Sequence, residues 1–454
     1  MTVSVTFLGG AGTVTGSKYL VQSDKHTLLV DCGLFQGYKQ LRRRNWSRLP
    51  IDPVSIDAVL LTHAHIDHSG YIPRLCRDGF KGKVYCTAPT RALCDVLLPD
   101  AGHLQERDAE GANKGGYTRH KPAQPLYTER DAHEALDHFR TVSFHKPLAL
   151  GADCTVTYFP AGHILGAASI QLDVEGKRIV FSGDIGRYGD PLMKDPETPP
   201  EADYLLIEST YGNRQHPETD AADALEEIIN RTLGRGGTVL IPSFAVGRAQ
   251  TLLFHIWRLQ QQGRVPDVPV YLDSPMAIDA SEIFEKYAAA HRLTSAEARA
   301  TCATAVYTRL GSESKQLDAD RNPKIIISAS GMATGGRILH HLKAYSGDPR
   351  STVLFAGYQA GGTRGAAMLQ GVERIKIHGK YWPVRAEVQV LSMLSAHADA
   401  EELMKWLSGF SKPPREVFVI HGEAEASDIF RHRIEEELGW PARAPDHGET
   451  VELS

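Results

Sequence analysis

The sequence has no closely spaced pair of cysteines, no long apolar run and no excess of positive charge. Its six cysteines lie far apart without a Cys-x-x-Cys pair, which argues against a cysteine zinc site and against a disulfide scaffold. No segment approaches the roughly 18 unbroken apolar residues of a membrane span, and the N-terminal stretch lacks the basic region of a secretory leader. These absences predict a cytoplasmic chain that makes no membrane contact.

The formal net charge of −5 excludes the attraction of a polyanion by bulk charge. Any nucleic acid must therefore be held by local clusters of cations or by metal ions. Internal repeats and low-complexity tracts are also absent. With 454 residues, 42% of them hydrophobic and 23% charged, the composition is that of an ordinary globular protein. Since one core rarely grows beyond about 300 residues, two domains are predicted.

The pattern of apolar residues changes twice along the chain. Up to about residue 208, short β-forming runs such as SVTFLGG are mixed with a helical pattern over 90–104. From 209 to 390, longer helical patterns separate continuous apolar strands such as KIIISAS, which is typical of a parallel sheet. Residues 391–454 carry histidines that the first region needs. The prediction is an α/β fold in which 1–208 and 391–454 form one domain and 209–390 form a second.

Residues 105–125 form a long, glycine-containing and locally basic stretch. Lys114, Arg119, His120 and Lys121 lie in it. It is predicted to be a surface loop, either near the substrate or simply a solvated connection, because long loops are often functional but need not be.

The strongest chemical signal is LTHAHIDHSG, which follows the apolar strand AVLL. Alternate residues of an extended segment face the same way, so His63 and His65 can bind one metal ion while the following turn directs Asp67 and His68 towards a second. A lone histidine would usually be structural. Four potential ligands at this spacing after a buried strand favour a metal site.

Two later strand ends carry further potential ligands. His163 lies in PAGHILGAAS, where small residues allow a close approach of the backbone, and Asp184 follows an apolar strand in FSGDIG. Taken singly, each is more typical of a surface turn. Together with the His63 cluster they are interpreted as ligands.

The series HxHxDH, His163 and Asp184 resembles the metallo-β-lactamase superfamily, and Asp31 in LLVDCG matches its first motif, a buried carboxylate that orients the histidines. The chain also resembles the β-CASP branch of nucleases along nearly its entire length. Glu208 in IESTYG, His397 in SAHAD and His421 in VIHGE match the branch's motifs A, B and C. IPSFAVGRAQ, DSPMA and SGMATGGR are similar to it as well.

The resemblance implies an αββα metallo-β-lactamase sandwich with an inserted α/β β-CASP domain. It also implies a ligand set for two Zn²⁺ ions per chain, since histidine-rich sites select zinc over magnesium. The first ion would be held by His63, His65 and His163, the second by Asp67, His68 and His421, with Asp184 bridging both.

The activity implied by the resemblance is hydrolysis of phosphodiester bonds by a metal-activated water. His397, held by Glu208, is the candidate general acid for the leaving 3′ oxygen. Asp67 and Asp31 complete the expected catalytic set. DNA-directed members of the branch replace the motif C histidine, so His421 implies RNA. The inserted domain is expected to restrict access to a cleft, which suits an extended single strand.

The segment IIISASGMATGGRILHHL predicts a strand, a glycine-rich loop and a helix. Such an arrangement favours a phosphate, although a purely conformational role is equally compatible with it. The candidate substrate-binding residues are Ser330, Gly331, Thr334, Gly335, Arg248 and Arg337.

Three other functions stay open from the sequence. The same metals could hydrolyse a small ester, thioester or lactam, or the chain could be a DNA-directed nuclease of the same branch. A third is a catalytically inactive RNA-binding subunit, although such relatives have lost ligands and all seven are present here. A homodimer and the identity of the natural RNA are open as well.

Overall fold

The computed structural model describes residues 2–116, 118, 120–357 and 359–454, and these fold into two compact units. Unit 1 comprises Met1–Gln215 and His397–Ser454, and unit 2 comprises His216–Ala396. The chain thus leaves unit 1 once and returns to it. The boundaries between the two units lie a few residues after the predicted domain limits at 208 and 390. The predicted domain limits stay predictions.

Unit 1 contains two seven-stranded sheets. The first has the order β22-β1-β2-β3-β4-β5-β6, antiparallel from β22 to β3 and parallel from β3 to β6. The second has the order β21-β20-β11-β10-β9-β8-β7. The strands of the first sheet are β1 (Val3–Gly9), β2 (Lys18–Gln22), β3 (Thr27–Val30), β4 (Ala58–Leu60), β5 (Lys83–Thr87), β6 (Phe139–Val142) and β22 (Thr450–Leu453). Those of the second are β7 (Leu148–Gly151), β8 (Cys154–Pro160), β9 (Ala168–Val174), β10 (Lys177–Phe181), β11 (Tyr204–Glu208), β20 (Glu416–Ile420) and β21 (Ala442–Arg443).

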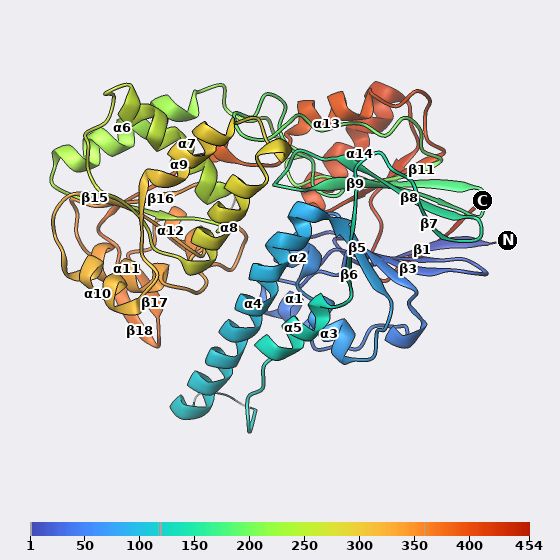
Figure 1. Ribbon diagram of the computed structural model, residues 1–454, viewed down its shortest axis with the longest axis horizontal. Helices are drawn as coiled ribbons and strands as arrows, with labels where there is room; N and C mark the ends of the chain where they lie inside the picture. The colour runs from blue at the N-terminus through green and yellow to red at the C-terminus, as the bar shows by residue number, and fades with distance from the viewer. Residues whose placement is uncertain (1, 117, 119, 358) are drawn as a thin grey trace. The chain divides into compact units, whose positions relative to one another are not determined.

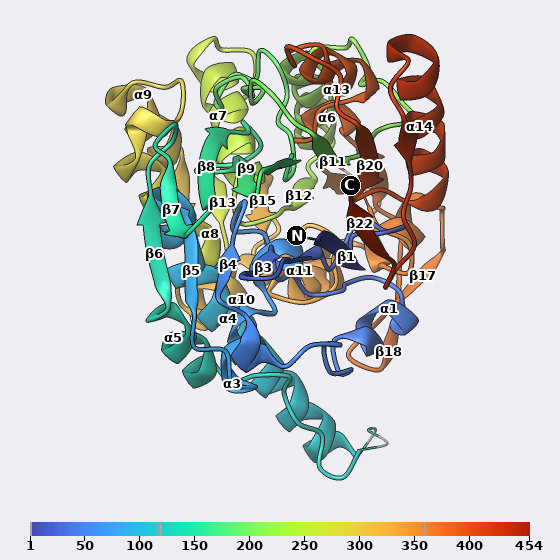
Figure 2. The same cartoon turned by 90° about the vertical axis from the view of Figure 1, so that its right-hand side faces the viewer.

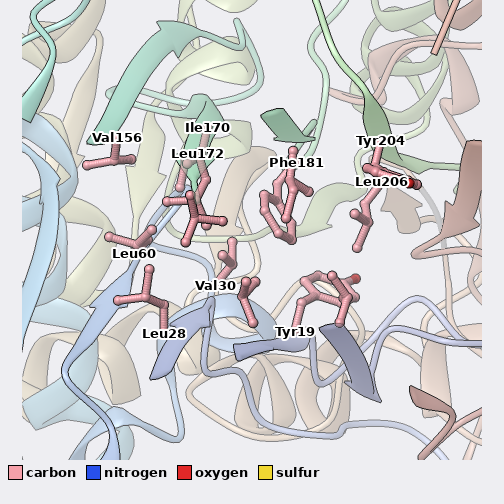
Figure 3. Packing of buried hydrophobic residues seen from close by; sticks show 14 of the residues in the cluster. Tyr19, Leu28, Val30, Leu60, Val156, Ile170, Leu172, Phe181, Tyr204 and Leu206 are labelled. Carbon is pink, nitrogen blue, oxygen red and sulfur yellow. The ribbon is translucent and has the colours of Figure 1, made fainter. Parts of the chain in front are cut away.

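The main core of unit 1 lies between the two sheets. Side chains alternate along a strand, so every second residue points into this core. Figure 3 shows Tyr19, Val30 and Leu60 of the first sheet facing Ile170 and Phe181 of the second. The two inner faces are almost entirely apolar, which holds the sheets together and fixes the positions of the loops at their edges.

Helices cover the outer face of each sheet (Figures 1 and 2). Trp406 of α13 and Phe430 of α14 pack on the second sheet in a separate apolar cluster, and α4 lies against β5 and β6 of the first. The helices of unit 1 are α1 (Lys39–Arg44), α2 (Ile66–Ser69), α3 (Ile72–Arg77), α4 (Ala88–Gly115), α5 (Glu129–Leu136), α13 (Ala400–Leu407) and α14 (Ala424–Leu438). The helix–sheet–sheet–helix order confirms the predicted α/β sandwich.

The predicted loop over 105–125 was wrong in its first half, because α4 continues to Gly115. The apolar pattern fades after Leu104, but most of the residues that follow, such as Gln105, Glu106 and Arg107, are good helix formers, and Glu110 pairs with Lys114 one turn later at 3.4 Å. Gly116, with φ of 62°, ends the helix in the left-handed conformation that glycine adopts easily. Arg119 lies outside the described residues.

Unit 2 is built around one parallel sheet of six strands in the order β14-β13-β15-β12-β16-β19. Apolar clusters lie on both of its faces, as expected for a sheet covered by helices on two sides. Its strands are β12 (Thr238–Pro242), β13 (Val270–Leu272), β14 (Ala305–Tyr307), β15 (Lys324–Ser328), β16 (Thr352–Phe355) and β19 (Glu387–Val390), with a hairpin of β17 (Arg374–Ile377) and β18 (Lys380–Pro383). Its helices are α6 (Ala221–Gly234), α7 (Arg248–Gln261), α8 (Pro275–Lys286), α9 (Ser295–Ala303), α10 (Gly311–Ala319), α11 (Ile338–Tyr345) and α12 (Arg364–Leu369).

Within the described residues, no helix combines the length and the apolar character needed to cross a bilayer.

Candidate metal centre

The candidate ligands of unit 1 lie where strands end. His63 and His65 follow β4, and α2 carries Asp67 and His68. The others follow β8, β10 and β20 of the second sheet. These three strands run in the same direction, since β8 and β10 are both antiparallel to β9 and β20 is parallel to β11, itself parallel to β10. Their carboxyl ends therefore meet at one edge, which brings together His163, Asp184 and His421.

A first group consists of His63, His65, His163 and Asp184. His65 Nδ1 lies 3.1 Å from His63 Nε2 and 3.2 Å from His163 Nε2. Asp184 Oδ2 lies 3.4 Å from His63 Nε2 and 3.7 Å from His163 Nε2. Burial holds the pKa of His63 well below its usual range and lowers the pKa of His65 to about 4, so both rings are neutral at neutral pH and offer lone pairs.

A second group consists of Asp67, His68 and His421. His421 Nε2 lies 3.1 Å from His68 Nε2 and 3.5 Å from Asp67 Oδ2. Burial alone would lower the pKa of His68, but Asp184 and Asp31 raise it well above its usual range. A cation bound here would therefore displace a proton, so its affinity should fall as the pH falls.

Asp184 lies between the two groups and is almost fully buried. Its Oδ2 faces the first group, while its Oδ1 lies 3.3 Å from His68 Nε2 without forming a hydrogen bond of good geometry within the described residues. Burial would raise the pKa of this carboxyl, but His421, His68 and His63 hold it well below its usual range. A buried carboxylate with an unsatisfied oxygen, ringed by imidazoles, fits bound cations well.

Asp31 orients the second group from behind. Its Oδ2 accepts a hydrogen bond from His68 Nδ1 at 2.7 Å, and its Oδ1 accepts one from the Thr62 backbone N–H at 2.8 Å. The Thr62 hydroxyl also donates to Asp31 and lies 3.1 Å from His63 Nδ1. Because Asp31 uses Nδ1 of His68, only Nε2 of that ring is left to face the second group.

Asp31→Asn should weaken zinc binding about ten- to a hundredfold, since the amide cannot reproduce the carboxylate that fixes the His68 ring. Competition with a chromogenic chelator would measure the affinity. Asp57→Asn is the matched control, because Asp57 is exposed, lies outside the metal centre and accepts the backbone N–H of Thr27 at 2.7 Å. Equal zinc affinity in the two variants would contradict an orienting role.

His397 and Glu208 form a pair beside the two groups. His397 Nδ1 lies 3.2 Å from Glu208 Oε2 and 4.0 Å from Asp184 Oδ2. Glu208 is fully buried, and its Oε1 accepts the backbone N–H of Ile185 at 2.6 Å. Burial lowers the pKa of His397, but Glu208 and Asp184 outweigh this effect and raise it above its usual value. The pair therefore favours the protonated form of this imidazole at the edge of the centre.

Two threonines in this region were not foreseen. Thr62 supports His63 and Asp31 as described, and Thr210 Oγ1 lies 3.1 Å from His421 Nδ1. Both stand within two residues of a motif, Thr62 before His63 and Thr210 after Glu208. Their position next to a motif was the one sequence signal that could have identified these threonines. Threonine is common at strand ends, however, and its hydrogen-bond partner is set by the tertiary structure.

The candidate substrate-binding residues all lie in unit 2, and all except Arg248 belong to a strand–loop–helix arrangement formed by β15 and α11. The Ser330 hydroxyl accepts from the backbone N–H groups of Thr334 at 3.0 Å and Gly335 at 3.3 Å, so the donors expected to hold a phosphate are already used inside the loop. Gly331 packs against Phe244: a Cβ at Gly331 would lie 2.8 Å from its ring. The phosphate cradle stays a prediction.

The two candidate arginines differ in their surroundings. Arg337 donates to Asp273 at 2.5 Å and to the carbonyls of Thr308 and Arg309. Its guanidinium is therefore already hydrogen-bonded within unit 2. Arg248 opens α7 and lies close to Gly357. A phosphate contact by Arg337 would compete with a buried ion pair, while that by Arg248 stays a prediction.

Three family models match the chain. The metallo-beta-lactamase superfamily model matches residues 11–242, the Beta-Casp domain model 249–368, and the Zn-dependent metallo-hydrolase RNA specificity domain model 381–445. Ribonuclease TTHA0252 of Thermus thermophilus is 38% identical over 427 residues, which cover 92% of each chain. The chain belongs to the β-CASP branch of the metallo-β-lactamase superfamily.

Other β-CASP relatives are similar over nearly the whole chain. Transcription termination factor FttA of Methanosarcina mazei is 31% identical over 471 residues, 99% of this chain and 72% of the relative. The RNase J-like protein of Methanocaldococcus jannaschii is 30% identical over 453 residues, 98% of this chain and 99% of the relative. The family models confirm the resemblance found in the sequence and make this chain a metal-dependent hydrolase.

A crystal structure titled as a protein of unknown function from Enterococcus faecalis V583 covers 100% of both chains with a TM-score of 0.53 and 13% identity. At this identity the likeness concerns the fold alone.

Proposed function

We propose that this β-CASP protein is a zinc-dependent ribonuclease that hydrolyses phosphodiester bonds of single-stranded RNA. The observation that carries the proposal is the pair of imidazole groups on opposite oxygens of Asp184, in a chain related to a ribonuclease over 92% of its length. The donor set is the argument for zinc, because imidazole nitrogens suit zinc and an all-oxygen shell suits magnesium.

We propose two zinc ions per chain. His63, His65 and His163 would hold one, Asp67, His68 and His421 the other, and Asp184 would contact both. Zinc bound there supplies an activated water and positive charge against the phosphate. All of these ligands come from one chain, so the activity is compatible with a monomer and with a homodimer.

The protein's own contribution to the chemistry is orientation and proton transfer. Asp31 and Thr62 fix the rings of His68 and His63 through Nδ1, so that both Nε2 atoms face Asp184. Glu208 directs His397 through Nδ1, and the imidazole would donate a proton to the leaving oxygen. Glu208 and Asp184 raise the pKa of His397, which favours the protonated, proton-donating form of the ring.

We further propose that the protein works in the cytoplasm. All six cysteines are free thiols and five of them are buried, which suits a compartment that keeps thiols reduced.

The zinc-loaded protein should cleave a 5′-labelled single-stranded RNA 20-mer faster than DNA of the same sequence at matched salt. The length of the labelled products separates internal cleavage from removal of nucleotides at an end. Chelation of the metal should abolish cleavage, and added zinc should restore it. Equal or faster cleavage of DNA would favour a DNA-directed nuclease. Turnover of a chromogenic ester panel without RNA cleavage would favour the small-molecule hydrolase.

A further inference from the structure

Residues 38–48 of unit 1, here the basic segment, combine clustered cations with exposed aromatic rings. Five cations lie within these residues, and no acidic residue occurs between Asp31 and Asp52. Tyr38 and Trp46 stand near its two ends with 51% and 56% of their surface exposed. The cations are Lys39, Arg42, Arg43, Arg44 and Arg48. In a chain with net charge −5 this is a strong local reversal of charge.

Nothing within the described part of the chain neutralises these charges. None of its ion pairs involves a cation of the basic segment, whereas arginines elsewhere in unit 1, such as Arg178 and Arg443, each pair with two carboxylates. Lys39 and Arg43 are four residues apart in α1, and like charges at this spacing destabilise a helix. The α1 helix also buries no side chain. Arg44 lies over the Phe35 ring at 5.4 Å, but the positive charge of the segment is not explained by internal charge pairing.

The basic segment is held firmly beside the metal centre. Asn45 is buried, and its amide both accepts from the Phe35 N–H and donates to the Phe35 carbonyl at 2.8 Å, closing the segment onto the preceding chain. That preceding chain is bonded to α2: Leu34 N–H donates to the Ile66 carbonyl at 2.9 Å, and Cys32 N–H to the His68 carbonyl at 2.7 Å. The segment thus begins a few residues from backbone that carries the ligands Asp67 and His68.

We propose that the basic segment is a second binding site for single-stranded RNA, which holds the strand outside the metal centre. This rests on the proposed ribonuclease function. Arginine side chains pair with backbone phosphates, and exposed Trp46 and Tyr38 offer faces on which unpaired bases stack. Interleaved cations and aromatic rings suit a single strand, because the bases of a duplex are already stacked on each other.

RNA fits the segment better than an anionic membrane does. A helix that lies on a membrane needs a continuous apolar face, whereas α1 has six residues, KQLRRR, of which only Leu41 is apolar. Neither aromatic ring lies within α1 itself, so no apolar stripe is formed.

The test compares Arg42→Ala/Arg43→Ala with Lys81→Ala/Lys83→Ala in the zinc-loaded protein. Lys81 and Lys83 are also exposed cations, but they lie at the start of β5, the end of the parallel β4–β5 pair remote from His63. The probe is a fluorescent 2′-O-methyl phosphorothioate RNA 20-mer, which resists cleavage. Its dissociation constant is measured by anisotropy over a range of salt concentrations.

The arginine variant should bind at least tenfold more weakly than wild type, and the slope of log K against log salt should fall by about 1.4, the loss of two phosphate contacts on a single strand. Trp46→Ala should weaken binding about five- to a hundredfold with little change of slope, because stacking is not ionic. The lysine control should match wild type. Hydrolysis of bis-p-nitrophenyl phosphate, which is too small to reach the segment, should be unchanged in every variant, as should the zinc content.

An arginine variant that binds with the affinity and salt slope of the lysine control would overturn the proposal. The proposal would also be overturned if the arginine substitutions weakened binding to phosphatidylserine vesicles more than binding to RNA. That result would assign the segment to a membrane surface. Failure of the proposed function is a different result: wild-type protein would then hydrolyse bis-p-nitrophenyl phosphate but leave RNA intact.

Discussion

Asp184→Asn should remove bound metal and catalytic activity together. The carboxylate lies between the two imidazole groups, with Oδ2 at 3.4 Å from His63 Nε2 and Oδ1 at 3.3 Å from His68 Nε2, so its loss weakens both metal sites at once. Asparagine has nearly the same shape but no charge. Since bound metal is worth several kcal/mol of charge stabilisation in the transition state, RNA cleavage should fall on the order of 10³-fold or more.

Metal content, rate and stability should be measured on the same samples. Wild type should contain about two zinc ions per chain by elemental analysis, because a site with a shared carboxylate holds a pair of metal ions, and Asp184→Asn well below one. Asp173→Asn is the matched control, since Asp173 is a partly exposed carboxylate of unit 1 that pairs with Arg178 at 2.6 Å. If Asp184→Asn kept both zinc ions and the wild-type rate, Asp184 would not be a ligand shared by the two metal ions. Active wild type that contains magnesium or calcium instead of zinc would refute the choice of metal.

The metal centre was the part of the structure most open to prediction from sequence, for a physical reason. Its ligands are polar residues placed directly after apolar strands, as in AVLLTHAH and IVFSGD, and strands that run in the same direction bring their ends to one edge of a sheet. The period of the strands and the identity of the residues after them are both local properties. What brought His421 to the same edge was the register of β20 beside β11, which only the family resemblance could anticipate.

Features that depend on distant partners were not predictable in this way. Arg337 was predicted to contact a phosphate because it stands near a helix start, and that contact stays a prediction; its pairing with Asp273, 64 residues away in the sequence, could not be foreseen. Asp273 also accepts from His341, a second partner that no local pattern announces. The end of α4 was missed for a related reason: its last turns bury little, so helix propensity, contacts such as the Glu110–Lys114 ion pair and the left-handed Gly116 decide where it stops.

His397→Ala should keep its zinc and still lose most of its activity. The side chain contacts Glu208 at 3.2 Å and approaches Asp184 Oδ2 only to 4.0 Å, while the seven proposed ligands already supply both metal ions. Loss of a general acid slows catalysis by roughly a hundred- to ten-thousandfold. An activated aryl phosphodiester, whose leaving group needs no proton, should be far less sensitive than RNA to the same substitution.

Glu208→Gln separates the proton donor from a merely structural histidine. Because the charge of Glu208 raises the pKa of His397, the neutral amide should lower that pKa, and the acidic form of the ring would then be lost at a lower pH. The alkaline limb of the rate profile for RNA should therefore move to lower pH in Glu208→Gln, with zinc content unchanged, and this limb should be absent in His397→Ala. If zinc is instead lost in proportion to activity in His397→Ala, the residue is a ligand, and another group donates the proton.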